Sequence, residues 1–126
     1  MIGYVTLGTN DLKGAAAFYD ALLGEIGAKR MMEGEAFIAW SVKPDLPGFG
    51  VTMPFDKKPA TVGNGVMVAL VVDSEAKVNA LHRKALQLGG QDEGPPGKRS
   101  EGFYAGYFRD LDGNKLNIFV AGSAVS

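Results

Sequence analysis

The stretch from Val5 to Gly27, VTLGTNDLKGAAAFYDALLGEIG, decides the fold because its pattern returns 63 positions later. The second copy runs from Val68 to Gly90 and reads VALVVDSEAKVNALHRKALQLGG. In each copy a short apolar run precedes a helical pattern, and glycine ends the pattern. Few identities survive between the copies, so the repeat is one of structure more than of sequence. The sequence therefore predicts two similar modules in tandem.

Both copies predict a helix, because apolar residues recur at helical spacing. In the first copy these residues are Leu12, Ala15, Ala16, Tyr19, Leu22 and Leu23. In the second copy they are Val78, Leu81, Ala85 and Leu88. Side chains that can cap a helix N-terminus precede each pattern, namely Asn10 and Asp11, then Asp73 and Ser74. The expected helices end at Gly24 to Gly27 and at Gly89 to Gly90.

Strand-like apolar runs surround each helix. In the first half they cover residues 4–7, 29–33, 36–41 and 49–53, and in the second half residues 66–72, 91–93, 104–109 and 115–120. The Asp-Gly pair within Asp110–Asn114 predicts a tight hairpin. We expect an α+β fold in which two tandem βαβββ modules form one curved, cup-like mixed sheet with helices on the outside. The expected domain has module one at 1–55, a linker at 54–65 and module two at 65–122, with the concave face as the natural ligand site.

Composition excludes several classes of function. The 126 residues include no Cys and one His, His82, which excludes disulfides, thiolate catalysis and zinc–thiolate sites. A net charge of −1 gives no reason to expect a nucleic-acid or membrane partner. No signal-peptide pattern is visible, and the longest apolar run, Val66 to Val72, is far shorter than the roughly 20 residues that span a bilayer. We expect a cytoplasmic protein.

Several segments together resemble the vicinal oxygen chelate superfamily, which holds the glyoxalase, bleomycin-resistance and extradiol-dioxygenase proteins. The opening VTLGTNDL and the following FYDALLG are similar to the family's first strand and helix. The later GFYAGYFRDLDGNK is similar to its final hairpin, and Gly63-Asn-Gly65 fits the start of its second module. The resemblance covers nearly the whole chain and implies the cupped fold.

The resemblance also implies where family enzymes hold a divalent metal, through His and Glu side chains on equivalent strands. Those positions correspond here to Tyr4, Met67 and Asn117, with a looser fourth position at Thr52. Phenol, thioether and amide groups are poor ligands for Ni, Zn, Fe or Mn. A single His also makes a two-His site impossible within one protomer. We therefore expect no metal and no other cofactor.

Eight residues are the candidate ligand-binding residues of the expected cup: Tyr4, Thr6, Trp40, Thr52, Met67, Tyr104, Tyr107 and Asn117. Core or dimer-interface packing is the alternative for Trp40, and alternation lets at most one of Tyr104 and Tyr107 face the cup. His82 is expected to be a partly exposed helix residue away from the cup. Gly94–Gly102 is expected to be a solvated loop, which could instead lie at the mouth of the cup and offer Lys98 and Arg99 to an anion.

Three functions stay open at this point. The first is a metal-independent small-molecule-binding protein that acts as a homodimer, similar to the drug-sequestering family members. The second is a glyoxalase-like lyase with a non-standard site, which needs an acid–base pair in the cup. Its nearest carboxylates, none with an obvious partner, are Glu33, Glu35, Asp56 and Glu101. The third is a pseudoenzyme whose cup is filled by its own side chains.

Overall fold

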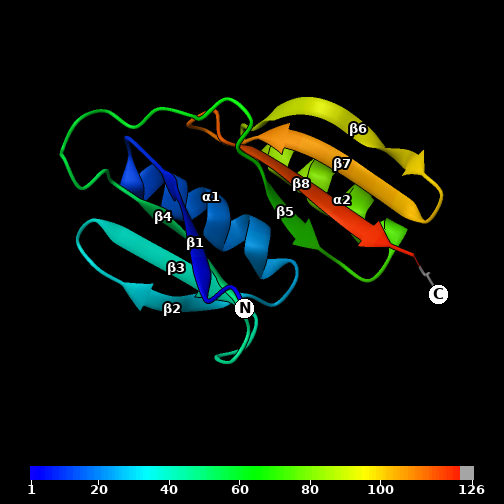
Figure 1. The fold of residues 1–126 in the computed structure, drawn as a ribbon, viewed down its shortest axis with the longest axis horizontal. Helices are drawn as coiled ribbons and strands as arrows, with labels where there is room; N and C mark the ends of the chain where they lie inside the picture. Colours follow the sequence, from blue (N-terminus) through cyan, green and yellow to red (C-terminus); the bar gives the residue numbers. More distant parts are fainter. Residues whose placement is uncertain (123–126) are drawn as a thin grey trace. The chain divides into compact units, whose positions relative to one another are not determined.

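The chain divides into two compact units, with the boundary between Val62 and Gly63. The computed structural model describes residues 1–122. Each unit contains one helix and one four-stranded sheet, in the order strand, helix and three strands (Figure 1). The predicted α+β fold with two tandem βαβββ modules is therefore confirmed.

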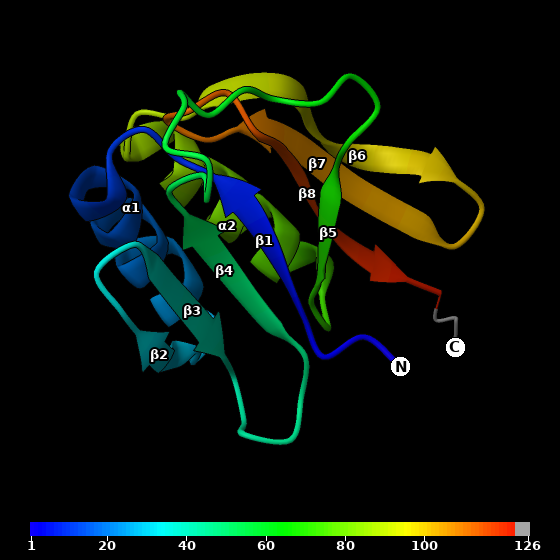
Figure 2. The ribbon, with the colours of Figure 1, turned by 60° about the vertical axis from the view of Figure 1, so that its left-hand side comes forward.

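Unit 1 contains β1 (Tyr4–Gly8), α1 (Leu12–Gly24), β2 (Lys29–Glu33), β3 (Phe37–Ser41) and β4 (Gly48–Thr52). The strands lie in the order β1-β4-β3-β2. β1 and β4 are parallel, and the other two pairs are antiparallel. α1 lies against one face of this sheet (Figure 2).

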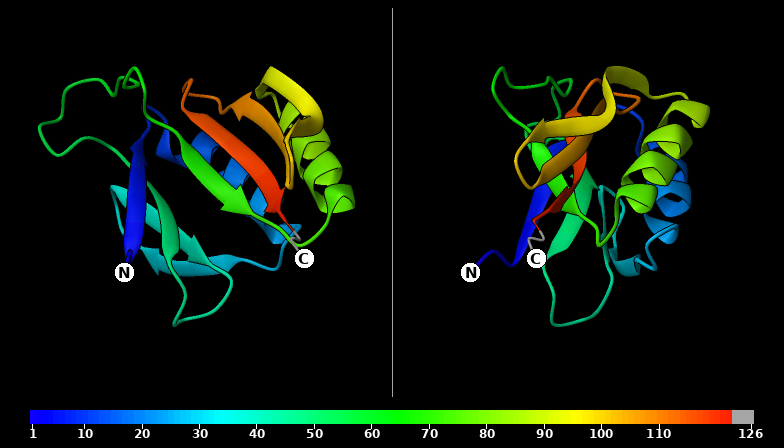
Figure 3. Two further views of the ribbon diagram at one scale, coloured as in Figure 1. Left: turned by 45° about the vertical axis from the view of Figure 1, so that its right-hand side comes forward. Right: turned by 90° about the vertical axis from the view of Figure 1, so that its right-hand side faces the viewer.

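Unit 2 contains β5 (Val68–Val71), α2 (Glu75–Gln87), β6 (Gln91–Ser100), β7 (Phe103–Arg109) and β8 (Lys115–Ala121). The strand order β5-β8-β7-β6 and the single parallel pair, β5 with β8, match those of unit 1. α2 again lies against one face of the sheet (Figure 3).

The two helices keep the spacing of the repeat. α1 begins at Leu12 and α2 at Glu75, and the difference of 63 is the offset that the sequence predicts. Each helix begins at one of its expected caps, because Asp11 accepts from the Gly14 amide and Ser74 accepts from the Lys77 amide.

The core of unit 1 lies between α1 and the sheet. Trp40 is 1% exposed, and its ring lies 5.7 Å from that of Tyr19 and 6.4 Å from that of Phe49. Its indole Nε1 donates a 2.8 Å hydrogen bond to Oδ1 of Asp20. Arg30 donates to the same carboxylate from Nε at 3.0 Å and from Nη2 at 2.7 Å.

The Asp20 carboxylate predicts a pH dependence of stability. The Arg30 guanidinium, helped by the Trp40 indole, holds the pKa of Asp20 below its usual value, against the opposing effect of partial burial. A lowered pKa in the folded state stabilises the protein above the unfolded pKa of about 3.9, and the contribution is lost as the pH falls through the folded value. We expect Asp20→Asn to lower the free energy of unfolding by about 1 kcal/mol at neutral pH, since the pair is exposed, and by less near pH 2. Urea unfolding at both pH values measures this, and an equal loss at both would contradict it.

One predicted segment is wrong. Residues 94–102 were expected to form a loop, but β6 runs through Ser100 and pairs with β7. Its register shifts between Asp92 and Gly94, between Gly94 and Gly97, and between Lys98 and Ser100. β6 is the edge strand of its sheet, and an edge with bulges tolerates the missing amide hydrogens of Pro95 and Pro96. Residues 94–100 therefore belong to a strand and not to a solvated loop.

Within residues 1–122, none of the helices combines the length and the apolar character that crossing a membrane demands.

Candidate functional site

Each sheet has one face that its own helix covers and one that it leaves uncovered, which we call the helix-free face. In unit 1, Trp40 and Phe49 are paired and both contact Tyr19 of α1, so they mark the helix side. In unit 2, a Cβ added at Gly106 would lie 3.1 Å from Cδ2 of His82 in α2. Gly106 therefore marks the helix side of this sheet. Alternation along the strands then assigns the remaining residues.

The helix-free face of unit 1 contains three predicted site residues, Tyr4, Thr6 and Thr52. Tyr4 is 56% exposed, and its ring lies 6.1 Å from that of Phe37. Thr6 and Thr52 lie on β1 and β4, in register with residues of the same face. The Thr52 hydroxyl donates to the carbonyls of Ala36 and Met53, at 3.2 and 2.9 Å. The hydroxyl of Thr52 is therefore already engaged with the backbone.

Asn117 lies on the helix-free face of unit 2, in β8, between Ala69 of β5 and Tyr107 of β7. Its side chain is 1% exposed, and Oδ1 has no hydrogen-bond partner among residues 1–122. Burying an unpaired acceptor costs about 1–3 kcal/mol, so nearly all buried polar atoms have partners. The unpaired Oδ1 of Asn117 therefore lowers the stability of the folded protein, because no group of its own sheet donates a hydrogen bond to it.

Tyr107 lies beside Asn117 and is flanked by two cations. The guanidinium carbon of Arg99 in β6 is 5.4 Å from the ring centroid, and Nζ of Lys115 in β8 is 5.6 Å from it. Both distances are within the range of a cation–π interaction. The predicted pair Lys98 and Arg99 is therefore divided: Arg99 lies beside Tyr107, whereas Lys98 is in register with Tyr104.

Two predicted site residues lie on the helix side instead. Trp40 packs in the core of unit 1, which is the core-packing alternative. Tyr104 donates a 2.7 Å hydrogen bond from its hydroxyl to Oδ1 of Asn79 in α2. As alternation requires, Tyr107 rather than Tyr104 shares a face with Asn117. Met67 directly precedes β5 and is 41% exposed.

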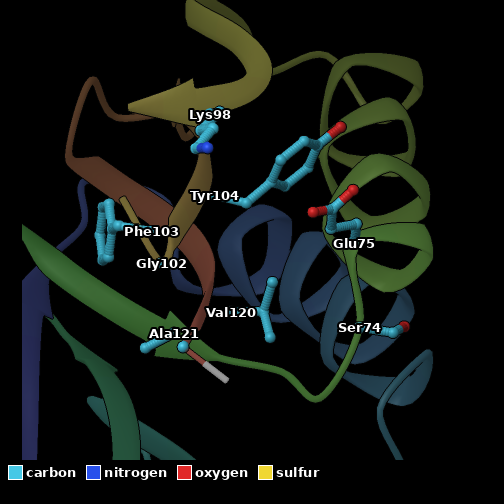
Figure 4. Close-up of a pocket in the computed structure, with 9 residues that line it drawn as sticks. Ser74, Glu75, Lys98, Gly102, Phe103, Tyr104, Val120 and Ala121 are labelled. Carbon is cyan, nitrogen blue, oxygen red and sulfur yellow. The ribbon is translucent and has the colours of Figure 1, made fainter. Parts of the chain in front are cut away.

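Tyr104 also lines a cavity of about 390 Å³ in unit 2 (Figure 4). Ser74 and Glu75, at the start of α2, lie across this cavity from Lys98 and Phe103. Lys98 is 3.4 Å from Glu101. The tyrosine and the lysine of this cavity are therefore already engaged with other residues.

His82 has a structural environment and not a catalytic one. It is 5% exposed, more buried than expected, and its Nε2 lies 3.0 Å from Oδ1 of Asp92 and 3.1 Å from the carbonyl of Tyr107. The Gly94 amide, followed by His82, holds the pKa of Asp92 below its usual value, against a smaller opposing effect of desolvation. The imidazole thus joins α2 to β6 and β7 on the helix side, away from Asn117.

The family model of the Glyoxalase/Bleomycin resistance protein/Dioxygenase superfamily matches residues 1–118. The chain belongs to this superfamily. A glyoxalase/bleomycin resistance protein from Albidiferax ferrireducens T118 is 35% identical, with a TM-score of 0.87 over 95% of this chain and 98% of that one. Membership confirms the resemblance drawn from the sequence.

Two other solved structures are less similar to this chain. A hypothetical protein from S. aureus is 26% identical, with a TM-score of 0.75 over 96% of this chain and 93% of that one. A lactoylglutathione lyase from Agrobacterium tumefaciens is 19% identical, with a TM-score of 0.72 over 95% and 92% of the two chains, a likeness that shows the fold alone. A search of curated proteins finds no match.

The residues at the superfamily's metal positions do not fit a divalent metal. Tyr4, Thr52 and Asn117 lie on helix-free faces, and Met67 lies just before β5, but none offers an imidazole, carboxylate or thiolate. Within the described part of the chain, no group of three His, Cys, Asp or Glu side chains could hold a metal. The phenol, hydroxyl and amide groups at these positions instead suit hydrogen bonding to an organic molecule.

Sequence reasoning missed two features of this site. Arg99 lies beside Tyr107 because glycines at 94 and 97 leave room for it: a Cβ at Gly94 would lie 3.3 Å from Nη2, and one at Gly97 would lie 2.9 Å from Nη1. Lys115 reaches the same ring from the opposite neighbouring strand. The glycines of 94–102 were interpreted as loop residues, although glycine within a strand also marks bulges and close approach.

Proposed function

We propose that this superfamily member binds a small organic molecule without a divalent metal, and that the molecule donates a hydrogen bond to Asn117. The unpaired Oδ1 of this buried side chain carries the proposal. An acceptor that no described residue satisfies, on the face that α2 leaves uncovered, is the kind of precisely placed polar group that fixes a ligand's orientation. Formation of a homodimer stays a prediction from the resemblance.

A lyase would need a general base beside the bound substrate. Three of the four carboxylates considered for that role are engaged elsewhere: Glu33 with Arg30 at 3.0 Å, Glu101 with Lys98 at 3.4 Å, and Asp56 with the Lys58 amide at 3.0 Å. Glu93 pairs with Arg109 at 3.4 Å. Binding rather than turnover is therefore the function that the side chains support best.

Asn117→Leu separates binding from stability. Leucine has a shape close to that of asparagine and removes the unpaired acceptor, so the free energy of unfolding should stay level or rise by up to about 1 kcal/mol. Binding of aromatic amides such as benzamide, 4-hydroxybenzamide and phenylacetamide, whose amides donate hydrogen bonds, should weaken at least about tenfold. Ligand-detected NMR and urea unfolding measure the two effects.

Asn114→Leu is the matched control. Asn114 is also buried, but its Nδ2 donates to Oδ2 of Asp110 at 3.1 Å. The substitution should cost about 1–2 kcal/mol of stability and leave amide binding intact. The proposal is overturned if Asn117→Leu destabilises the protein and binds the amides unchanged, or if neither the amides nor their matched acids bind the native chain. One equivalent of Ni, Zn, Fe or Mn that survives dialysis would contradict the absence of a metal.

A further inference from the structure

Two cations on the helix-free face of unit 2, Arg99 and Lys115, lie beside the Tyr107 ring. Among residues 1–122, neither Arg99 nor Lys115 takes part in an ion pair, whereas Lys98 and Arg109 on the same two hairpins both do. Arg99 is exposed and Lys115 is half-buried. The two positive charges meet at one tyrosine ring, from the strands on either side of β7.

The arrangement holds Arg99 in place before any ligand arrives. Its Nη2 donates a 2.5 Å hydrogen bond to the carbonyl of Pro95, and its guanidinium lies beside the Tyr107 ring. Gly94 is in register with Tyr107 and Gly97 with Ala105, so the side chain crosses β6 where no Cβ obstructs it. A cation that is positioned in advance loses less conformational entropy when an anion binds.

Asn117 and Tyr107 are directly opposite each other, so the unpaired acceptor and the two cations belong to one patch. The acceptor can bind an N–H or O–H group, and the two cations can bind a negatively charged group.

We infer that the ligand of this site is a small organic oxyanion that also carries a hydrogen-bond donor, with the anion held by Arg99 and Lys115 and the donor on Asn117. This inference rests on the proposed binding function and names the class of ligand. The chain's net charge of −1 does not predict this preference, because the charges that matter are local.

The test compares each aromatic amide with its matched acid. 4-Hydroxybenzoate, which carries both an oxyanion and an O–H donor, should bind about tenfold more tightly than 4-hydroxybenzamide in 50 mM salt, because two cations face one charge, and the preference should shrink in 500 mM salt. Benzoate and phenylacetate carry no hydrogen-bond donor for Asn117 and should bind more weakly than 4-hydroxybenzoate. Phenyl phosphate, assayed beside them, shows whether carboxylate or phosphate is the preferred oxyanion. Titrations followed by NMR give each dissociation constant.

Three substitutions locate the preference. Arg99→Gln and Lys115→Gln should each reduce the preference for acids over amides about threefold or more. Lys98→Gln removes the same charge from the adjacent residue of β6, which is in register with Tyr104 on the helix side, and should leave the preference unchanged. Arg99→Lys keeps the charge and should retain most of the preference.

The outcomes separate this inference from the proposed function. If amides and acids bind equally to the native chain, or if Lys98→Gln lowers the preference as much as Arg99→Gln, the oxyanion inference is wrong although the binding function stands. If neither amides nor oxyanions bind, the proposed function fails, and the inference that rests on it fails too.

Discussion

Replacing Trp40 with alanine is expected to lower the free energy of unfolding by about 4 kcal/mol, the largest effect of any single change considered for this protein. The indole is 1% exposed and lies among Tyr19 and Phe49, so alanine would leave a large cavity between α1 and the sheet. The substitution also removes the donor that reaches Asp20 at 2.8 Å. Urea unfolding followed by circular dichroism measures the loss.

Trp40→Phe is the control for cavity size. Phenylalanine fills much of the space but lacks the Nε1 donor, so we expect a loss of about 1–2 kcal/mol. Because Trp40 lies on the helix side, the folded Trp40→Phe variant should bind the aromatic acids as the native chain does. A loss of binding without a loss of stability would place the indole in the ligand site and would overturn its assignment to the core.

Replacing Asp110 with alanine is expected to cost about 3 kcal/mol. Asp110 is buried where β7 turns into β8, and its Oδ1 accepts from the amides of Asp112 and Asn114, each at 2.9 Å. Its Oδ2 accepts from Asn114 Nδ2 at 3.1 Å. Alanine would leave the buried Asn114 amide without these acceptors, and hydrogen bonds to a charged group are worth about 1.5–3 kcal/mol.

Asp45→Ala removes an exposed carboxylate from a loop of unit 1 and serves as the reference for charge alone. It should change stability by less than about 0.5 kcal/mol. Thermal unfolding of both variants gives the comparison. Equal and small effects would show that the hairpin does not depend on the Asp110 side chain.

Much of this fold could be predicted because local signals and the repeat agree. The candidate caps placed the helix starts within a residue of Leu12 and Glu75, where the structure has them. The strand at residues 29–33 was predicted with its observed bounds. These features depend on neighbours in sequence, which a pattern records directly.

The errors concern features that depend on partners distant in sequence. Pro95 and Pro96 indicate a loop when read locally, but the edge position of β6 makes a bulged strand possible. Trp40 could be assigned to a face of its strand, but not to the face that α1 covers. The partnership of Arg99 with Tyr107 depends on the pairing of β6 with β7, which strand pattern alone does not set.

The core position of Trp40 has an optical consequence. It is the only tryptophan in the sequence, so tryptophan emission, excited selectively over tyrosine, reports on the module in which Trp40 lies. Circular dichroism in the far ultraviolet averages over the helices and strands of both. Coincident curves from the two signals would show that the duplicated halves melt as one cooperative system, and displaced curves would resolve two transitions. The single tryptophan thus serves as a built-in fluorescent label of one of the two repeated modules.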